Sequence, residues 1–374
     1  MTRIKLGMVG GGHGSFIGAV HRIAARIDDR FELVAGALSS DPTRALASAQ
    51  ALEIDPSRTY VNFADMARSE AQRSGGIQAV SIVTPNHLHA DAAIVFLEAG
   101  IHVICDKPLT VSSQEASRIK AALEVSNASF FLTHNYTGYP LIREARHRIM
   151  AGQLGEIRLV QAEYAQDWLA DPIEESGQKQ ATWRTDPKFT GGGGAIVDIG
   201  THAYNLVHFV TGLKANELAA DLSSFASRRE VDDNAHIWLR YPNGARGQLW
   251  ISQVAIGNEN ALSLRVYGSN GGLEWQQENP NILWITPKGG PRQRITRGSD
   301  RLSADAIAAT RIPAGHPEGY LEGFATLYSD IADCLIDNIE NQALPGIYDG
   351  MEGMFFIEAC IASSAENSTW QALR

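Results

Sequence analysis

The sequence predicts two domains, an α/β domain over residues 1–135 and an α+β domain over residues 136–374. Three observations lead to this fold class. The chain of 374 residues is longer than a single core usually holds. In its first third, short runs rich in β-branched residues alternate with longer amphipathic segments, a pattern typical of βαβ units in a parallel sheet. After residue 135, strand candidates follow one another with only turns between them, which predicts a large, open and mostly antiparallel sheet.

Strands and helices alternate in the first domain. The expected strands cover residues 4–9, 31–38, 80–84, 103–105 and 130–133. Residues 17–27, 90–99 and 113–125 carry apolar side chains at steps of three and four, as helices with one buried face do. Gly100, directly after the second helix, suits a helix C-terminus.

The second domain is expected to begin with strands and to end with helices. Its strands cover residues 156–164, 234–240, 245–253, 263–267 and 273–275, and turn sequences at 241–244 and 268–272 separate some of them. Helices are expected over residues 320–339 and 349–365, packed behind this sheet or onto the first domain. Apolar and aromatic residues alternate along the strands, and Trp238, Leu249 and Trp250 suggest a sheet face covered by another subunit.

Composition narrows the possible partners. A formal net charge of −10 leaves no excess of basic residues to neutralise phosphates, so nucleic acid is not an expected partner. The three cysteines, Cys105, Cys334 and Cys360, lack metal-type spacing, which argues against structural zinc and favours a reducing compartment. The first apolar run is too short for a secretory signal, and no run approaches the roughly 20 apolar residues of a membrane span. A cytoplasmic protein is therefore expected.

A glycine-rich loop follows the first strand and opens directly into a helix. This context lets backbone N–H groups and a helix N-terminus face a pyrophosphate, which predicts a dinucleotide site. Gly10 and Gly12 supply the first two glycines of the dinucleotide fingerprint, whereas Ser15 stands where the third belongs. A glycine turn without a ligand is the alternative. The candidate cofactor contacts here are Gly10, Gly12, His13, Ser15, Phe16 and Ile17.

The end of the second strand leaves the choice of dinucleotide open. No acidic residue ends this strand, and Ser39, Ser40 and Asp41 follow it, with Arg44 three residues on. Asp41 could hold the ribose hydroxyls of NAD, while the serines and Arg44 could accept the 2′-phosphate of NADP. Because no arginine stands directly beside the serines, NAD is favoured and NADP is not excluded. Asp41 could equally form a turn ahead of Pro42.

Polar motifs follow two more strands of the predicted parallel sheet. Residues 84–89 read Thr-Pro-Asn-His-Leu-His, and Asp106-Lys107-Pro108 follows the next strand. Ligands bind outside the carboxyl ends of the strands in such sheets, so both motifs are expected in a cleft. Lys107 is expected to line this cleft; a solvated surface lysine is the alternative.

The second domain contributes a glycine run followed by Asp198 and His202. Because they are four residues apart, these two side chains share one face of a helix. A hydroxyl must lose its proton as its carbon gives up hydride, and a neutral histidine is suited to accept that proton. Asp198 can orient the imidazole or hold a neighbouring hydroxyl. An ordinary Asp/His pair on a helix is the alternative, and neither interpretation requires a metal.

Together these motifs resemble those of the Gfo/Idh/MocA family, named for glucose-fructose oxidoreductase, inositol dehydrogenase and a rhizopine catabolism protein. The family's marks are a glycine loop, a T-P-x-x-x-H segment, an E-K-P segment and a G-x-x-x-D-x-x-x-H segment. The resemblance covers essentially the whole chain, and it departs where Asp106 replaces the usual glutamate. It implies a Rossmann dinucleotide-binding domain and a homo-oligomer, dimer or tetramer. It also implies an NAD(P)-dependent dehydrogenase that oxidises a hydroxyl of a cyclic polyol or sugar, such as an inositol or a pyranose.

The resemblance also implies roles for individual residues. Lys107 would reach the substrate hydroxyl, and Asp198 and His202 would complete the catalytic set. Asn135 would lie in the same cleft, or would only cap the domain junction. The residues implied for the cofactor are Thr84, Pro85, Asn86, His87, His89, Asp106, Lys107, Pro108, Asn135, Trp183 and Arg184. The substrate candidates are Lys107, Tyr136, Tyr164, Gln166, Asp198, His202 and His316.

In the expected mechanism His202 is the general base, Lys107 polarises the reacting oxygen and Asp198 fixes the geometry. The roles of Lys107 and His202 could be exchanged. Two alternatives stay open: a dehydrogenase that oxidises carbon 3 of a sugar or glycoside, and a non-catalytic regulator that binds the dinucleotide.

Overall fold

The computed structural model describes residues 3–337, 339 and 341–373, which pack into two compact units. The first unit runs to Asn135 and also includes Tyr320–Met351, and the second comprises Tyr136–Gly319 and Glu352–Arg374. The division into domains 1–135 and 136–374 stays a prediction. The structure groups residues 320–351 with the first unit, whereas the sequence analysis assigned them to the second domain.

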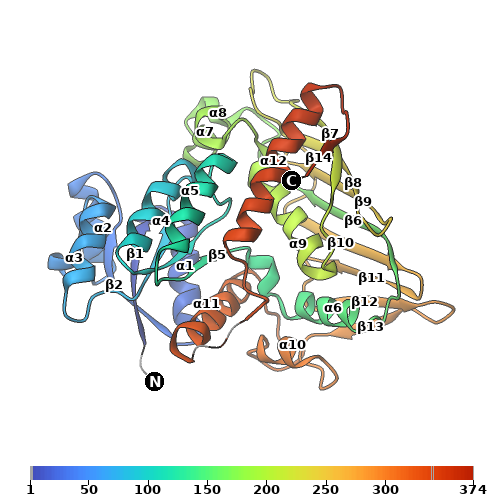
Figure 1. Ribbon diagram of the computed structural model, residues 1–374, viewed down its shortest axis with the longest axis horizontal. Coiled ribbons are helices and arrows are strands. Elements are labelled where there is room, and N and C mark those ends of the chain that lie inside the picture. The colour runs from blue at the N-terminus through green and yellow to red at the C-terminus, as the bar shows by residue number, and fades with distance from the viewer. Residues whose placement is uncertain (1–2, 338, 340, 374) are drawn as a thin grey trace. The chain divides into compact units, whose positions relative to one another are not determined.

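A parallel five-stranded sheet organises the first unit (Figure 1). Its strands are β1 (Ile4–Gly10), β2 (Phe31–Ala37), β3 (Ala79–Val83), β4 (His102–Cys105) and β5 (Phe130–Leu132). They lie in the order β2-β1-β3-β4-β5, so the direction of chain progress reverses beside β1. Loops after neighbouring strands diverge at such a point and leave a crevice for a ligand. The predicted parallel α/β sheet is confirmed.

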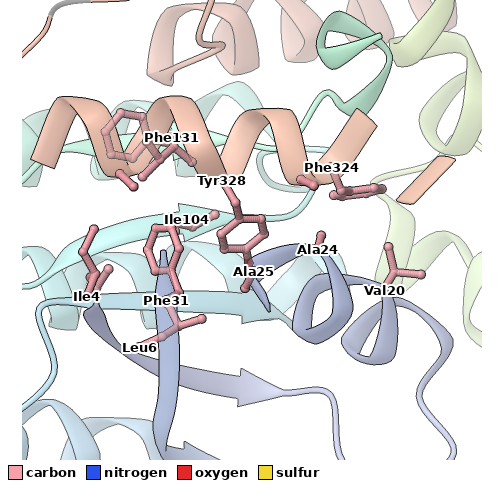
Figure 2. Packing of buried hydrophobic residues seen from close by; sticks show 14 residues of the cluster. Ile4, Leu6, Val20, Ala24, Ala25, Phe31, Ile104, Phe131, Phe324 and Tyr328 are labelled. Atoms are coloured by element: carbon pink, nitrogen blue, oxygen red, sulfur yellow. The ribbon is translucent and has the colours of Figure 1, made fainter. Parts of the chain in front are cut away.

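Helices of the first unit cover both faces of this sheet. Helix α1 (Phe16–Ile27) packs with α11 (Tyr320–Asp337) over Leu6 and Phe31, as Figure 2 shows. Alternation along β1 turns Gly7 to the other face, where an added Cβ would lie 2.4 Å from Met66 of α3. The other helices are α2 (Pro42–Ala51), α3 (Phe63–Gln72), α4 (His89–Glu98) and α5 (Ser113–Glu124).

A nine-stranded sheet organises the second unit, in the order β13-β12-β11-β10-β6-β9-β8-β7-β14. Only β6 and β9 pair in parallel, so the predicted mostly antiparallel sheet is confirmed. Its strands are β6 (Ile157–Ala165), β7 (Glu217–Ser223), β8 (Asn234–Arg240), β9 (Arg246–Ser252), β10 (Ala261–Gly268), β11 (Gly271–Gln276), β12 (Ile282–Pro287), β13 (Gln293–Thr296) and β14 (Gln371–Ala372).

Helices α6 (Pro140–Met150) and α9 (Thr201–Thr211) pack against one another on one face of this sheet. Helix α12 (Ile347–Ala365) joins them there through Phe356, which stacks on Tyr204 at 4.4 Å. The shorter helices are α7 (Lys179–Arg184), α8 (Pro187–Thr190) and α10 (Ala304–Ala308). Across the described part of the chain, no helix combines the length and apolar character that a membrane crossing needs.

The opposite face of the large sheet carries exposed apolar side chains. Leu159 is 52% exposed and Trp238 is 53% exposed, and Trp250 is half-buried beside them in the sheet. Leu249 differs from the expectation, because it is buried on the helix-covered face. The reason is the two-residue period of a strand, which places Leu249 and Trp250 on opposite sides.

Candidate functional site

The loop after β1 has the shape of a phosphate cradle. Gly10 adopts a φ of +78°, a conformation that favours glycine. Gly12 is closely covered, because an added Cβ would lie 2.7 Å from the carbonyl oxygen of Leu38. Ser15 begins α1, and its hydroxyl accepts a hydrogen bond from the N–H of Gly18 at 3.2 Å. The loop therefore brings bare backbone to a helix N-terminus, as a pyrophosphate site requires.

Gly18, rather than residue 15, performs the packing role of the third fingerprint glycine. An added Cβ on Gly18 would lie 2.4 Å from the Cα of Gly11, so only glycine lets α1 approach the loop. The expectation that the third position falls on Ser15 missed this shift. A glycine inside a predicted helix was the available signal, because it lowers helix stability unless packing requires it.

The residues after β2 act first as helix caps. The carboxylate of Asp41 accepts a hydrogen bond from the N–H of Arg44 at 2.8 Å and so caps α2. The Ser39 hydroxyl accepts one from the N–H of Asp41 at 3.2 Å. This is the turn-forming alternative that the Asp41-Pro42 sequence left open. Roles of Ser39, Ser40, Asp41 and Arg44 toward a cofactor stay predictions.

Two loops at the ends of β3 and β4 are tied together by His89. One ring nitrogen lies 2.9 Å from the carbonyl oxygen of Pro108, and the other lies 2.9 Å from that of Thr84. The Thr84 hydroxyl and the side-chain amide nitrogen of Asn135 are buried without a hydrogen-bond partner in the described residues. Buried polar groups seldom stay unpaired, so these two atoms fit a site that a polar ligand completes. The glycine cradle and these orphaned groups suit a dinucleotide.

Lys107 interacts electrostatically with two side chains of the first unit, Asp106 and His134. Asp106 accepts a hydrogen bond from the Thr133 hydroxyl at 2.9 Å. Burial acts to raise the pKa of the Asp106 carboxyl, but its interactions with His21 and Lys107 lower that pKa below its ordinary value. Burial, aided by the charge of Lys107, lowers the pKa of His134 to about 3, so this ring is neutral. Lys107 is thus set beside a carboxylate and an uncharged imidazole.

His202 lies in the second unit against two tyrosine rings. Its ring packs edge-on to Tyr136 at 4.9 Å and is tilted to Tyr164 at 6.3 Å. The two tyrosine hydroxyls are 2.5 Å apart, and Tyr164 donates to the side chain of Asn260 at 2.8 Å. Burial raises the pKa of Tyr136, so its hydroxyl stays protonated and can donate. The structure therefore brings together three predicted residues, His202, Tyr136 and Tyr164.

Asp198 joins this group through Gln166, a predicted substrate contact, and through Gln253 and Asn260, which the sequence did not indicate. Gln253 donates to Asp198 at 2.9 Å, and Arg184 forms an ion pair with it at 3.3 Å. Gln253 also reaches Gln166 at 3.4 Å, and Gln166 donates to Asn260 at 2.7 Å. Gln253 and Asn260 carried no local signal, because they lie between β9 and β10, more than 50 residues after Asp198 in the sequence. A line of amides and hydroxyls thus leads from Asp198 to the tyrosines.

Two further predicted site residues of the second unit, Trp183 and His316, are not part of the hydrogen-bonded group described around Asp198. Trp183 packs under the guanidinium of Arg184 at 4.3 Å, a cation–π contact that orients the arginine toward Asp198. His316 is exposed in a loop whose main-chain carbonyl accepts a hydrogen bond from Arg297. None of the hydrogen bonds described for the Asp198 group reaches His316. Its role in substrate binding stays a prediction.

A buried carboxylate holds the start of the helix that carries Asp198 and His202. This helix opens with one π-helical turn, Ile196–Gly200, and continues as α9. Asp232 accepts hydrogen bonds from the N–H groups of Gly194 at 2.6 Å and Ile196 at 2.9 Å. A π-helical turn is rare and is frequent at functional sites, so a firm anchor beneath it is expected.

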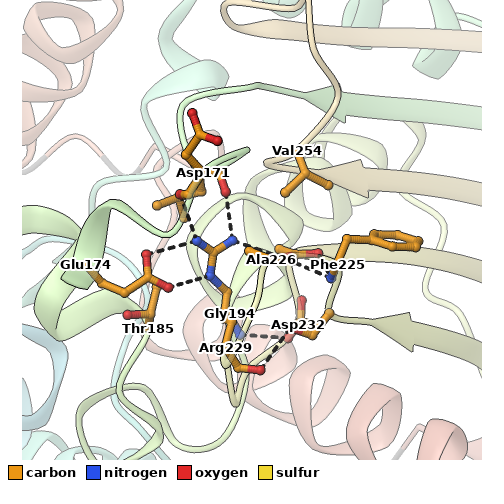
Figure 3. A network of polar contacts seen from close by, with 12 residues as sticks. Asp171, Glu174, Thr185, Gly194, Phe225, Ala226, Arg229, Asp232 and Val254 are labelled. Atoms are coloured by element: carbon orange, nitrogen blue, oxygen red, sulfur yellow. Dashed lines mark hydrogen bonds and ion pairs between the residues drawn. The ribbon is translucent and has the colours of Figure 1, made fainter. Parts of the chain in front are cut away.

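A second buried network fixes the loop before α7. Figure 3 shows Arg229 bound by Glu174, with both nitrogen-to-oxygen distances 2.9 Å, and by the carbonyl of Asp171. Arg229 also pairs with Asp233 at 3.0 Å, directly after Asp232 in the chain. The side chains of Arg229 and Asp233 are both 0% exposed. This arrangement ties the loop that leads to Arg184 to the same strand start that anchors Asp198.

Asp232 makes the stability of this region depend on pH. Burial raises its pKa to about 6 despite its two backbone N–H donors. Between about pH 4 and pH 6 the folded protein therefore holds a proton that the unfolded chain has lost, so the unfolding free energy falls as pH rises. The contribution across this window is about 3 kcal/mol. Asp232→Asn should abolish it, and thermal unfolding at several pH values measures the difference.

The matched control for this prediction is Asp55→Asn. Asp55 is an exposed cap whose pKa is lowered, chiefly by the N–H of Ser57, so its contribution to the unfolding free energy grows as pH rises. Asp55→Asn should remove this contribution, a change opposite in sign to that of Asp232→Asn. Equal pH dependence in wild type and Asp232→Asn would show that Asp232 is ionised as an ordinary carboxyl.

Comparisons with known proteins agree with this geometry. The model of an oxidoreductase family with an NAD-binding Rossmann fold matches residues 4–134, and the GFO/IDH/MocA C-terminal domain model matches residues 142–274. A crystal structure of an oxidoreductase from Sinorhizobium meliloti is 52% identical and has a TM-score of 0.91. That match covers 99% of this chain and 100% of the other.

Two further relatives have named ligands or substrates. An inositol dehydrogenase homologue from Azotobacter vinelandii, solved with NADH and myo-inositol, is 35% identical over 99% of this chain and 98% of its own, with a TM-score of 0.91. The levoglucosan dehydrogenase of Pseudarthrobacter phenanthrenivorans is 29% identical, and the match covers 76% of each chain. This chain belongs to the Gfo/Idh/MocA family and is an oxidoreductase with an NAD-binding Rossmann domain.

Proposed function

We propose that this enzyme oxidises a secondary hydroxyl of a cyclic polyol or sugar, such as an inositol or a pyranose, to a ketone or lactone. The observation that carries the proposal is the group around His202. Two tyrosine hydroxyls and three side-chain amides form one hydrogen-bonded set with Asp198, and the ring of His202, the candidate base, packs against the same two tyrosines. Hydroxyl-rich ligands are recognised by such groups, and a relative binds myo-inositol.

The proposed chemistry gives each predicted catalytic residue one role. The bound nicotinamide supplies the hydride acceptor. His202 takes the hydroxyl proton, and Lys107 stabilises the negative charge that develops on the oxygen. Asp198, held by Arg184 and Gln253, keeps the substrate and the imidazole in place. The proposed cofactor contacts are the glycine loop, the segment 84–89, Lys107 and Asn135.

A second candidate is oxidation of a glycoside, for which a cavity provides the argument. An open cavity of about 810 Å³ in the second unit is lined by Asn260, Gln277 and Glu318, among others. Asn260 also holds Tyr164 and Gln166, so this cavity adjoins the His202 group. Its volume is within the range of sites for drug-sized ligands, which leaves room for a substituent beyond one ring.

A substrate panel tests the proposal. Inositols, free hexoses and their glycosides are offered in turn with NAD and with NADP, and reduction of the cofactor is followed. We expect turnover with at least one inositol or free sugar and with NAD. Turnover of glycosides alone would select the second candidate. Bound cofactor with no reduction across the panel would favour a regulator of the same fold.

We also propose that the exposed face of the large sheet is an interface between copies of this chain. Leu159 and Trp238 give this face apolar side chains that single molecules in water seldom expose together. The expected assembly is a dimer or tetramer. Light scattering measures the mass in solution, and a monomer at all concentrations would reject this proposal.

A further inference from the structure

A chain of buried polar groups runs through the first unit toward the segment that carries Lys107. The hydroxyl of Tyr328, on α11, lies 2.8 Å from Nδ1 of His21 and 2.6 Å from the hydroxyl of Ser81. His21 belongs to α1 and Ser81 to β3, so three distant parts of the sequence meet here. Tyr328 points from α11 into the packed core in Figure 2. All three side chains are at most 1% exposed, so they form a buried, hydrogen-bonded polar group inside an otherwise apolar core.

The other end of the chain faces Asp106. Nε2 of His21 lies 3.7 Å from Oδ1 of Asp106 and is buried without a hydrogen-bond partner. This distance exceeds that of a hydrogen bond, so the contact is electrostatic in this structure. Thr133 donates to the same carboxylate oxygen at 2.9 Å. Long contacts of this kind often tighten when an enzyme binds its ligands.

The hydrogen-bond donors can be assigned by elimination. A neutral imidazole donates through only one nitrogen. If Ser81 donates to Tyr328, the tyrosine hydroxyl donates to Nδ1 of His21, and the ring proton is left on Nε2, toward the Asp106 carboxylate. The opposite tautomer would turn a nitrogen lone pair toward that negative charge, which is unfavourable. The Asp106 carboxylate therefore favours the proton on Nε2, and the Tyr328 hydroxyl supports that tautomer by donating to Nδ1.

The far side of Lys107 is held as well. The carbonyl oxygen of Pro108 lies 2.9 Å from Nδ1 of His89, whose other ring nitrogen contacts the carbonyl of Thr84. The residues before and after Lys107 are thus each in contact with a buried histidine. A lysine side chain has a flexible four-carbon stem, so fixing the residues on both sides of Lys107 narrows the positions that its ammonium group can take.

We propose that Ser81, Tyr328 and His21 form a positioning chain that fixes the Asp106 side chain and, through it, the placement of Lys107 for the reaction. The residues of this chain are positioning residues, since they act through Asp106. The inference rests on the proposed catalytic role of Lys107. A hydroxyl on α11, more than 200 residues away in the sequence, thereby contributes to the rate of the reaction.

The test variant is Tyr328→Phe, which keeps the ring in the core and removes only the hydroxyl. We expect kcat to fall about tenfold, the lower end of the loss seen when a residue that orients a metal ligand is removed. KM and the dissociation constant of NAD should change little, because the cofactor cradle is untouched. The matched control is Tyr60→Phe, which removes the hydrogen bond to Glu70 at 3.0 Å in the same unit and should leave kcat unchanged.

A second background separates positioning from a general loss of structure. We expect Lys107→Arg to have a lower kcat than the wild type, and adding Tyr328→Phe to it should cause little further loss of kcat, because the chain works through the lysine. An equal fractional loss in both backgrounds, or a wild-type kcat in folded Tyr328→Phe, would overturn the inference. If Tyr328→Phe does not fold, Ser81→Ala replaces it. We expect a smaller fall in kcat for this variant, and an unchanged kcat would contradict the positioning chain. Wild-type turnover in Lys107→Ala would instead defeat the proposed catalytic role of Lys107, on which this inference rests.

Discussion

Replacing Lys107 or His202 by alanine is expected to lower kcat by a factor of about 10² to 10⁴, the usual contribution of a positioned acid or base. The physical reason is the developing alkoxide: without the base the proton has no acceptor, and without the ammonium group the charge is not stabilised. The affinity for NAD should stay nearly unchanged, because the glycine cradle of the first unit is intact. Steady-state kinetics and calorimetric titration with NAD measure the two quantities.

Two exposed residues of the same types are the controls for these variants. Lys288→Ala and His147→Ala remove a surface lysine and a surface histidine and should leave kcat unchanged. Near-normal turnover in both Lys107→Ala and His202→Ala would defeat the catalytic assignment. A large effect in only one of them would identify which residue carries the proton.

Gly18→Ala is expected to have the second-largest effect, on cofactor binding. The new Cβ would lie 2.4 Å from the Cα of Gly11, so either α1 or the glycine loop must move. Overpacking of this kind costs about 1–3 kcal/mol, which corresponds to roughly a 5- to 150-fold weaker affinity for NAD if the loop takes the strain. Titration with NAD measures the change.

Gly353→Ala is the matched control for Gly18→Ala. Gly353 also lies inside a helix, α12, but an added Cβ there would meet only Thr201, at 4.0 Å. The same substitution should therefore be neutral or slightly stabilising, since alanine favours helix. Wild-type affinity for NAD and wild-type thermal stability in Gly18→Ala would contradict the prediction that the contact with Gly11 requires glycine at position 18.

The first unit could be predicted well because its strands are buried runs and its helices are amphipathic. The strand predicted over residues 103–105, for example, is β4 (His102–Cys105), and Gly100 ends α4 with a φ of +72°. Helix α2 (Pro42–Ala51) was missed because its buried positions hold only alanine and serine, which give a weak pattern. Local sequence therefore located elements with a strong apolar face and not those without one.

Strand β7 shows why part of the second sheet could not be predicted. Its sequence, Glu-Leu-Ala-Ala-Asp-Leu-Ser, consists largely of residues that favour helices. It forms a strand because it pairs with β8 along seven residues, an interaction that no local pattern reveals. Strands β12 and β13 were missed as well, and they too are defined by their pairing with neighbours.

The candidate site divides in the same way. Asp198 and His202 could be recognised from their spacing on one helix, and Lys107 from its place at a strand end. Their supports could not: Gln253 and Tyr328 lie 55 and 221 residues away from the residues they serve, Asp198 and Lys107. Spatial neighbours of this kind are set by the sheet and helix packing, and only the folded chain shows them.

Transfer of deuterium from substrate to cofactor tests the central claim most directly. A polyol or sugar that the substrate panel identifies is labelled with deuterium on the carbon that bears the reacting hydroxyl, and the reduced cofactor is examined by mass spectrometry. The account predicts deuterium in the reduced nicotinamide and a slower chemical step with the labelled substrate. Reduced cofactor without deuterium would contradict direct hydride transfer from that carbon.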